Sequence, residues 1–381
     1  MIAPRFHRLT VSEKIAQTAD SVSIAFAIPA QLRADYQFSQ GQFVTLRQPI
    51  AGAEQRRSYS VCVSVDDYRQ RGQLRVGVKR VAGGLFSNWV NDHLQVGDAI
   101  DVMTPDGRFF TPLDPKQHKH YLAFAGGSGI TPVLSLIKTS LAQEPRSSFT
   151  LIYGNRGVAA IMFLEELEDL KNQYLDRLTL YYVLSDEAHE IDLLHGMLDR
   201  RRCDRFLATA VAAATIDEAF VCGPEPMMLA AEQALLAAGV ARRKIHVERF
   251  GTPTPPNSKL ELESKREPEA ELSRTAAAQS GNGLAASAGA QVEFIINGKS
   301  RQLSVRRDGV GLLDAGLAAG LDLPYACKGG VCCTCRAKIL EGKVKMDKNY
   351  TLEDWEIAKG FVLTCQSHPL TDRVVVSYDE R

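Results

Sequence analysis

The chain has 381 residues, which predicts about two to three domains. Lys plus Arg and Asp plus Glu number 45 each, so the net charge gives no reason to expect a nucleic-acid or anionic-membrane partner. No apolar run approaches the roughly 20 residues of a membrane helix, and the opening segment MIAPRFHRLT lacks the apolar core of a signal peptide. These features, with eight cysteines, predict a protein of the reducing cytoplasm.

Short strand patterns separated by turn signals fill the first part of the chain. They are QFVTLRQ, RSYSVCVS, QLRVGVKR and AIDVMTP. This pattern predicts an antiparallel β-barrel over residues 1–112. On one strand, Arg57-Ser58-Tyr59-Ser60 places a cation and an aromatic ring on one face, which suits phosphate and ring binding. The alternative is an exposed strand with a cross-strand tyrosine.

A second barrel motif, Gly83-Gly84-Leu85-Phe86-Ser87, precedes the amphipathic stretch SNWVNDHL. A glycine turn that opens a helix offers free N–H groups to a phosphate. The alternative is a simple turn between a hairpin and a helix.

From about residue 118, apolar strands alternate with amphipathic helices, which predicts a doubly wound parallel sheet over residues 113–250. The strands are HYLAFAG, FTLIYG, LTLYYVLS, EAFVCG and IHVERF, and the helices are TPVLSLIKTSLA, IMFLEELEDLKNQY, IDLLHGMLDR and PMMLAAEQALLAAG.

Two turns of this region follow strands at the sheet edge where α/β proteins bind ligands. The first is GGSGITP, residues 126–132, whose glycines would let a pyrophosphate reach the backbone at the start of a helix. The second is CGPEP, residues 222–226. Each is a weak signal alone, because a plain tight turn explains the first and a turn with a buried cysteine explains the second.

Residues 251–290 contain no aromatic residue, Val or Ile and are rich in Pro, Gly, Ser, Ala and charge. Such a composition predicts a flexible linker of about 30–40 Å. Beyond it, QVEFIING and RQLSVRRD predict a hairpin, GLLDAGLAAG a helix, and RAKILEGKV and RVVVSYD further strands. Residues 291–381 are therefore expected to form a small α+β domain of the β-grasp type.

Four cysteines in this domain, Cys327, Cys332, Cys335 and Cys365, have the C-x4-C-x2-C spacing and distant fourth ligand of plant-type [2Fe–2S] ferredoxins. The alternatives are structural zinc, which usually shows paired C-x2-4-C knuckles, and disulfides, which suit secreted chains. Cys333, inside the loop, is interpreted as a small apolar filler and not as a fifth ligand.

Taken in order, these motifs resemble the ferredoxin–NADP reductase superfamily, and the C-terminal ferredoxin domain is similar to that of reductase components of multicomponent oxygenases. The resemblance covers nearly all of the chain apart from the linker. Finer motifs, such as YACKGGVCCTC, LIYGNR and DLLHG, resemble the reductase subunits of bacterial phenylacetyl-CoA epoxidases, which supply a separate di-iron oxygenase.

The resemblance implies roles for individual residues. The proposed FAD-binding residues are Arg57, Ser58, Tyr59, Ser60, Val78, Lys79, Gly84, Leu85, Phe86, Ser87 and Phe250. The proposed NAD(P)-binding residues are Gly126, Gly127, Ser128, Gly129, Thr131, Arg156, Ser185, Cys222 and Gly223. Ser60 near the flavin N5, Cys222 beside the nicotinamide ring, and Glu248 are then the candidate catalytic residues. For Phe250, packing in the core is an equal alternative to covering the flavin. His195 is expected to be a structural or surface histidine and not a catalytic base.

The identity of the nicotinamide cofactor is less clearly indicated. Arg156 suits a 2′-phosphate, whereas Asp186 and Glu187, which follow Ser185, favour an unphosphorylated ribose. The resemblance implies NADPH, with NADH as the alternative.

We therefore expect hydride transfer from NAD(P)H to FAD, then single-electron transfer to the cluster, which moves on its linker to the oxygenase. The rival interpretations are a reductase of a Rieske-type steroid or aromatic hydroxylase and, more remotely, a zinc-binding module without enzymatic activity.

Overall fold

The computed structural model describes residues 5–251 and 289–380. These residues form two units. The first consists of the residues up to Phe250 together with Pro324–Cys327, and the second of the other residues from Gly289 on. Each unit is described separately. The predicted linker lies outside the described residues except at its two ends. Within the described ranges, no helix is both long enough and apolar enough to cross a membrane.

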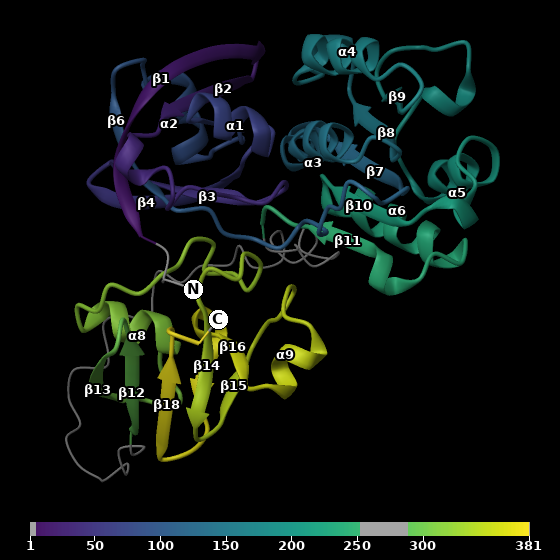
Figure 1. Ribbon diagram of the computed structural model, residues 1–381. Coiled ribbons are helices and arrows are strands. Elements are labelled where there is room, and N and C mark those ends of the chain that lie inside the picture. Colours follow the sequence, from purple (N-terminus) through teal and green to yellow (C-terminus); the bar gives the residue numbers. More distant parts are fainter. Residues whose placement is uncertain (1–4, 252–288, 381) are drawn as a thin grey trace, which may run out of the picture. The chain divides into compact units, whose positions relative to one another are not determined.

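The first unit begins with a six-stranded antiparallel sheet in the order β4-β3-β6-β1-β2-β5 (Figure 1). Its strands are β1 (Phe6–Thr18), β2 (Ser21–Ala27), β3 (Phe43–Ile50), β4 (Ala53–Ser60), β5 (Gln73–Lys79) and β6 (Ala99–Met103). Just beyond β4, Val61 pairs with Val76 of β5, so the sheet closes on itself as the predicted barrel. β1 and β2 add two strands to the four predicted from the sequence.

The barrel carries η1 (Ala30–Leu32) and two α-helices, α1 (Val65–Arg71) and α2 (Leu85–Asp92). α1 is not predicted by the hydrophobic pattern, but its ends follow local rules. The Ser64 side chain caps it by accepting a hydrogen bond from the Asp67 N–H, and Gly72 ends it in the left-handed conformation at φ 64°. This helix leads the chain from β4 back to β5.

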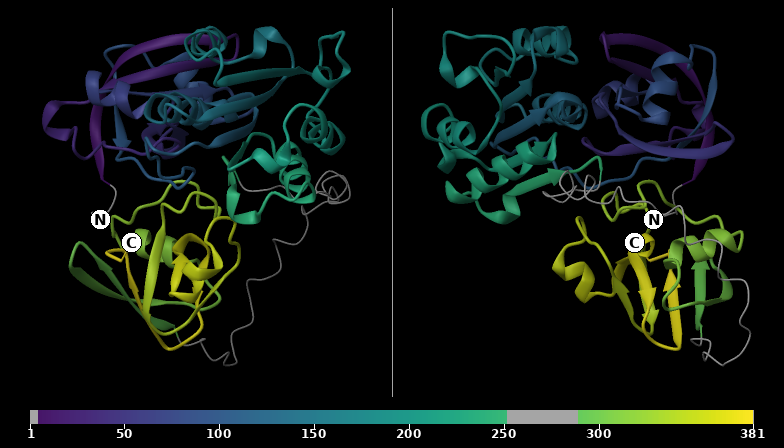
Figure 2. Two further views of the ribbon diagram at one scale, coloured as in Figure 1. Left: turned by 45° about the vertical axis from the view of Figure 1, so that its right-hand side comes forward. Right: turned by 180° about the vertical axis from the view of Figure 1, so that it is seen from behind.

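A five-stranded parallel sheet in the order β11-β10-β7-β8-β9 completes the first unit. Its elements are β7 (His120–Gly126), η2 (Gly127–Gly129), α3 (Ile130–Gln143), β8 (Ser148–Asn155), η3 (Val158–Ala160), α4 (Leu164–Gln173), β9 (Leu178–Leu184), η4 (Asp192–Leu194), α5 (Arg200–Thr209), η5 (Ala213–Thr215), β10 (Glu218–Cys222), α6 (Glu225–Ala237), η6 (Arg242–Lys244) and β11 (Ile245–Glu248). α3 and α4 share one apolar core with one face of the sheet, and α5 and α6 share another with the opposite face (Figure 2). This is the predicted doubly wound arrangement.

The prediction of a helix over residues 191–200 is wrong. Only the short η4 forms there, and the chain then turns at Gly196, whose φ of 103° is left-handed. α5 begins only at Arg200, where the Asp199 side chain accepts a hydrogen bond from the Arg202 N–H. The apolar residues of this segment therefore belong to a loop at the sheet edge.

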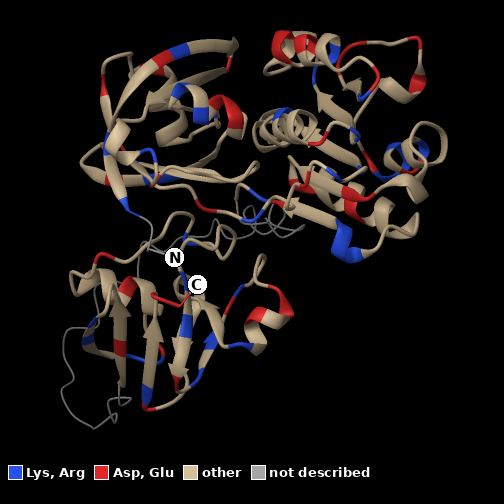
Figure 3. Ribbon diagram, in the orientation of Figure 1, with Lys and Arg blue, Asp and Glu red and all other residues tan. Residues whose placement is uncertain are grey.

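The second unit contains a mixed five-stranded sheet in the order β13-β12-β18-β14-β16, in which β12 and β18 are parallel. The elements of this unit are β12 (Ala290–Ile296), β13 (Lys299–Val305), α8 (Leu312–Ala318), β14 (Arg336–Glu341), β15 (Val344–Met346), α9 (Asp354–Ala358), β16 (Phe361–Leu363), η7 (Thr364–Gln366), β17 (Ser367–Pro369) and β18 (Arg373–Ser377). β15 and β17 pair as a separate two-stranded sheet. Sheet and helix together match the predicted α+β class. Acidic and basic residues are interspersed along the elements of both units (Figure 3).

Candidate functional site

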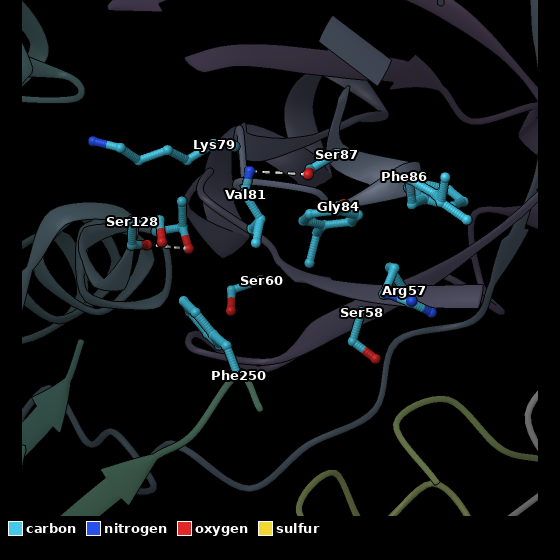
Figure 4. Close-up of a pocket in the computed structure, with 14 residues that line it drawn as sticks. Arg57, Ser58, Ser60, Lys79, Val81, Gly84, Phe86, Ser87, Ser128 and Phe250 are labelled. Carbon is cyan, nitrogen blue, oxygen red and sulfur yellow. Dashed lines mark hydrogen bonds between the residues drawn. The ribbon is translucent and has the colours of Figure 1, made fainter. Parts of the chain in front are cut away.

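A cleft of about 290 Å³ lies beside β4 and the start of α2, and we call it the barrel cleft (Figure 4). It is lined by Arg57, Ser58, Tyr59, Ser60, Gly77, Lys79, Val81, Gly84, Leu85, Phe86, Ser87, Ser128, Thr131 and Phe250. In Figure 4, Arg57 and Ser58 lie at one end of the cleft and Lys79 and Ser128 at the other. The barrel and the first turn of the parallel-sheet region therefore both contribute to it.

The turn before α2 provides a cradle for an anion. The Ser87 hydroxyl accepts a hydrogen bond of 3.1 Å from the Val81 N–H. A Cβ at Gly84 would lie 2.9 Å from the Ser87 hydroxyl oxygen and 3.1 Å from the Val81 carbonyl oxygen, so the turn leaves no room for a side chain there. The bare backbone of this turn and the start of α2 suit a phosphate.

The glycine turn after β7 approaches the end of β10 very closely. A Cβ at Gly129 would lie 2.1 Å from the Cys222 carbonyl oxygen, and Gly127 has a left-handed φ of 51°. The Thr131 hydroxyl donates a 3.0 Å hydrogen bond to the Ser128 carbonyl oxygen. η2 runs directly into α3, and the Ile130 N–H donates to the Gly127 and Ser128 carbonyl oxygens. The N–H groups that precede any helical partner are therefore those of the glycine turn itself, and these can bind an anion.

A second, larger cleft of about 740 Å³ runs along the carboxyl ends of the parallel strands, and we call it the sheet-end cleft. It is lined by Lys79, Gly126, Gly127, Ser128, Gly154, Asn155, Arg156, Ala160, Val183, Ser185, Gly196, Met197, Leu198, Asp199, Arg200, Gly223, Pro224, Pro226, Met227, Ala230 and Phe250. It shares Lys79, Ser128 and Phe250 with the barrel cleft. Two ligands in these clefts would therefore meet at these three residues.

One buried polar group in the sheet-end cleft is unsatisfied within the described part of the chain. The amide nitrogen of Asn155 is buried, and beyond the Tyr153 hydroxyl nearby it has no hydrogen-bond partner there. A buried donor without a partner is unfavourable unless a ligand or water accepts its hydrogen bond. The cleft therefore suits a polar ligand.

Cys222 and Glu248 are neighbours at the carboxyl ends of β10 and β11. Cys222 is fully buried, and burial, with a smaller contribution from Glu248, raises the pKa of its thiol well above the ordinary value. Burial, with the nearby Asp106 charge, raises the pKa of Glu248 to about 8. At neutral pH both groups are therefore largely protonated.

The cysteine loop of the second unit is held in an unusual backbone conformation. Lys328, Gly330 and Cys333 all have left-handed φ angles, of 51°, 77° and 57°. A Cβ at Gly330 would lie 3.0 Å from the Lys348 carbonyl oxygen, so this position requires glycine. Cys335 is buried within hydrogen-bonding reach of the Cys365 thiol. The loop therefore brings thiols from separate elements close together, and within the described residues no group of three or more possible ligands is arranged to hold a metal ion.

Family models match three consecutive parts of the chain. They are an oxidoreductase FAD-binding domain at residues 8–110, an oxidoreductase NAD-binding domain at residues 124–233 and a 2Fe-2S iron-sulfur cluster binding domain at residues 294–370. The chain is 42% identical to a subunit of the 1,2-phenylacetyl-CoA epoxidase of Escherichia coli (strain K12), over 99% of this chain and 98% of that protein. It belongs to the oxygenase-reductase branch of the ferredoxin–NADP reductase superfamily.

The reductase is similar to two further proteins over nearly its full length. One is the ferredoxin reductase component of 3-ketosteroid-9-alpha-monooxygenase of Mycobacterium tuberculosis (strain ATCC 25618 / H37Rv), at 37% identity over 98% of this chain and 96% of that protein. The other is the solved structure of phthalate dioxygenase reductase, at 22% identity, a TM-score of 0.56 and 98% coverage of both chains. This structural likeness supports the three-part fold.

Ten of the eleven residues proposed for FAD line the barrel cleft of the reductase, and Val78 is the exception. Its side chain is fully buried in the barrel core. Successive residues of a strand point to opposite faces, so Gly77 and Lys79 face the cleft and Val78 faces the core. Phe250 is 49% exposed, so it is not a core residue.

The residues proposed for the nicotinamide cofactor divide into two groups. The sheet-end cleft is lined by Gly126, Gly127, Ser128, Arg156, Ser185 and Gly223. Thr131 lines the barrel cleft, whereas Gly129, inside the glycine turn, and Cys222, at the end of β10, are buried and line neither cleft. Cys222 lines neither cleft because Gly129 closely approaches the end of β10, and its place beside the nicotinamide ring stays a prediction.

Of the proposed catalytic residues, Ser60 lines the barrel cleft, whereas Glu248 lines neither cleft. His195 also lies outside both, with its Nδ1 2.8 Å from the Glu187 carbonyl oxygen. Sequence reasoning missed the lining segment from Met197 to Arg200, because its apolar residues favour a helix. The position of this segment after a parallel strand is the signal that could have revealed it.

Proposed function

We propose that the reductase carries electrons from NADPH, through FAD and a [2Fe–2S] cluster, to a separate di-iron oxygenase that epoxidises phenylacetyl-CoA. This places it in phenylacetate catabolism in the cytoplasm. The observation that carries the choice of partner is the 42% full-length identity with the protein from the phenylacetyl-CoA epoxidase, compared with 37% for the steroid monooxygenase component. A Rieske-type steroid hydroxylase is accordingly the second candidate partner.

The barrel cleft has the features that FAD requires. Arg57 can pair with a pyrophosphate, the turn from Gly84 to Ser87 offers backbone N–H groups, and the Tyr59 ring can pack against an aromatic cofactor. When bound, FAD accepts a hydride and releases electrons singly. The residues of the chain contribute by holding the ring in place and limiting the access of water.

The meeting of the two clefts supports direct transfer between two bound cofactors. Phe250 lines both clefts and is half exposed, so its ring can cover one cofactor and move aside for the other. Lys79 lines both as well, and its ammonium lies 3.5 Å from the Asp20 carboxylate. In this proposal Lys79 and Phe250 position the two cofactor rings, and neither side chain acts as an acid or a base.

The charges of the sheet-end cleft support NADPH over NADH. Arg156, Ser185 and Arg200 line the cleft, whereas Asp186 and Glu187 do not. The Glu187 carboxylate accepts a 2.9 Å hydrogen bond from the Val158 N–H, and Asp186 accepts one of 2.6 Å from the Ser185 hydroxyl. The two acidic groups are thus used within the loop. Arg156 and Arg200 form ion pairs with Asp20 and Asp204, at 3.6 and 2.8 Å, but their side chains are 70% and 43% exposed and can also pair with a 2′-phosphate.

This proposal predicts a selective effect of an Arg156→Ala variant. The KM for NADPH should rise by about tenfold, because one charge-assisted contact is lost, and the KM for NADH should change little. Equal changes for both cofactors would contradict the assignment of Arg156 to the 2′-phosphate.

For the cluster we propose Cys327, Cys332, Cys335 and Cys365 as ligands, with the 2Fe-2S domain match at residues 294–370 as support. We further propose the domain division 1–112, 113–250 and 291–381, with residues 251–290 as a tether. Such a tether keeps the cluster near the flavin at high effective concentration and leaves it free to visit the oxygenase.

The experiment that tests the function is reconstitution with purified oxygenases. A visible spectrum before and after anaerobic NADPH first establishes whether flavin and cluster are present and reducible. The reductase is then supplied to a phenylacetyl-CoA epoxidase or to a steroid 9α-hydroxylase, and product formation is measured. Faster turnover with the epoxidase supports the proposal, and faster turnover with the hydroxylase replaces it with the second candidate.

A further inference from the structure

Four charged side chains meet where the barrel packs against the parallel sheet within the first unit. They come from β5 (Arg75), α1 (Asp67), α3 (Lys138) and α4 (Glu166), and we call them the Glu166 network. Arg75 Nη2 donates to both Glu166 carboxylate oxygens, at 2.7 and 2.6 Å. Lys138 Nζ lies 2.8 Å from Glu166 Oε1 and 3.1 Å from the Asp67 carboxylate. Glu166 therefore joins a barrel strand to two helices of the parallel-sheet region.

The network is largely shielded from solvent. The exposed fractions of the side chains are 16% for Arg75, 17% for Lys138, 25% for Glu166 and 34% for Asp67. Burial alone would raise the pKa of Asp67, but Lys138 and the hydrogen bond from Ser64 lower it below its ordinary value. Attraction between such partly buried charges is stronger than on an open surface, and removing one partner is correspondingly costly.

α3, which carries Lys138, also contacts the barrel at other points along its length. The Ser135 hydroxyl donates a 2.7 Å hydrogen bond to the Val63 carbonyl oxygen, and the Val65 N–H donates one of 3.2 Å to the Thr139 hydroxyl. At its first turn, a Cβ on Gly77 of β5 would lie 2.7 Å from the Thr131 side chain. α3 can therefore hardly shift without disturbing the barrel.

α3 also carries residues of both clefts at its amino end. Thr131 lines the barrel cleft, and Ser128, in the turn that leads into the helix, lines both clefts. The Glu166 network holds the middle of this helix, since Lys138 lies two turns further along it. A change in the network is therefore transmitted to the place where the two clefts meet.

We propose that Glu166 is a positioning residue for hydride transfer, because it fixes α3 and α4 on the barrel and so sets how the nicotinamide ring approaches the flavin. This inference rests on the proposed location of FAD in the barrel cleft and of the nicotinamide cofactor in the sheet-end cleft. It does not depend on the identity of the oxygenase. Glu166 touches neither cleft, so it acts through the backbone that it holds in place.

The test compares Glu166→Gln with Glu165→Gln, a matched control on the exposed side of the same helix turn. Glu166→Gln keeps the size of the side chain and removes its charge, which leaves Arg75 and Lys138 facing each other. Flavin reduction by NADPH is followed by anaerobic stopped-flow at saturating nucleotide. Bound FAD per chain, the apparent dissociation constant for NADP⁺ and the long-wavelength charge-transfer absorbance of the nucleotide complex are measured as well.

In Glu166→Gln we expect the reduction rate to fall by about tenfold to a hundredfold, because small misplacements of reacting groups have effects of this size. The charge-transfer absorbance should weaken, and bound FAD and NADP⁺ affinity should change little. Glu165→Gln should behave like the wild type. A wild-type rate in Glu166→Gln, or an equal loss in both variants, would overturn the proposal.

If Glu166→Gln does not retain FAD, Lys138→Gln provides the second variant, because it removes one cation and leaves the Arg75–Glu166 pair in place. A smaller fall in rate with intact FAD content supports the proposal, and an unchanged rate and charge-transfer band overturn it. Reduction of the wild-type flavin by NADPH is measured first. If NADPH does not reduce the wild-type flavin, the proposed function is refuted, whereas a slow rate in the variants alone concerns only the role of Glu166.

Discussion

The raised pKa of Glu248 predicts how the free energy of unfolding depends on pH, including the sign of that dependence. Burial and the Asp106 charge raise its pKa from an ordinary value of 4.5 to about 8 in the folded protein. Between these two pH values the folded state binds a proton that the unfolded state has released. Unfolding therefore releases this proton, and the free energy of unfolding falls as the pH rises through this window. A Glu248→Gln variant cannot ionise and lacks this dependence.

The size of the effect follows from the shift. A difference between 4.5 and about 8, at about 1.36 kcal/mol per pH unit, amounts to at most about 5 kcal/mol. Below about pH 4.5 the two proteins should respond to pH alike. Above about pH 8 the advantage of the variant should level off, because Glu248 is then ionised in both states of the wild type.

The assay is thermal unfolding of both proteins, followed by circular dichroism from about pH 5 to about pH 9. The melting temperature of Glu248→Gln relative to the wild type should increase steadily up to about pH 8 and then become constant. Glu165→Gln, which removes an exposed carboxylate, is the control and should follow the wild type. Parallel curves for Glu248→Gln and the wild type would refute the raised pKa.

Three other variants test separate parts of the molecule. Cys335→Ser should abolish cytochrome c reduction, which needs the cluster, and leave ferricyanide reduction by the flavin nearly intact; loss of both in a folded, flavin-loaded variant contradicts the order of transfer. Gly129→Ala places a Cβ 2.1 Å from the Cys222 carbonyl oxygen, so the turn must shift and NADP⁺ affinity should fall by about tenfold; an unchanged affinity in a fluorescence titration contradicts this. Glu356→Gln removes a fully buried carboxylate 2.9 Å from Arg336 Nε, which should destabilise the second unit by about 3–5 kcal/mol. The variant should therefore lose the visible absorbance of the cluster at a lower temperature than the wild type. An unchanged temperature would contradict this prediction.

The fold class and most of the cleft residues were predictable from the sequence because their signals are local. A glycine turn between a strand and a helix, as at Gly126–Thr131, has the same meaning wherever it occurs in an α/β sheet. The cysteine spacing carries similar local information. In the segment before α5, by contrast, the apolar residues suggest a helix, but the left-handed Gly196 and the capping residue Asp199 place its start several residues later.

Features that depend on tertiary contacts were not predictable in this way. Arg75 and Glu166 lie 91 residues apart in the sequence, so nothing local indicates that they pair. The Val78 side chain faces the core because a shift of one residue along a strand exchanges the two faces, and its contact with the flavin stays a prediction. The burial of Cys222 behind Gly129 likewise depends on how two strand ends approach each other.

The three residues shared by the two clefts limit how the electron donor could be changed by protein engineering. Substitutions at Lys79, Ser128 or Phe250 alter both clefts at once. Variants at these positions would therefore change the retention of FAD together with the preference for NADPH or NADH. Arg156, Ser185 and Arg200 line only the sheet-end cleft. Substitutions confined to these positions can change the preference between NADPH and NADH without changing how much FAD is bound. Engineering of the reductase to use NADH should begin there.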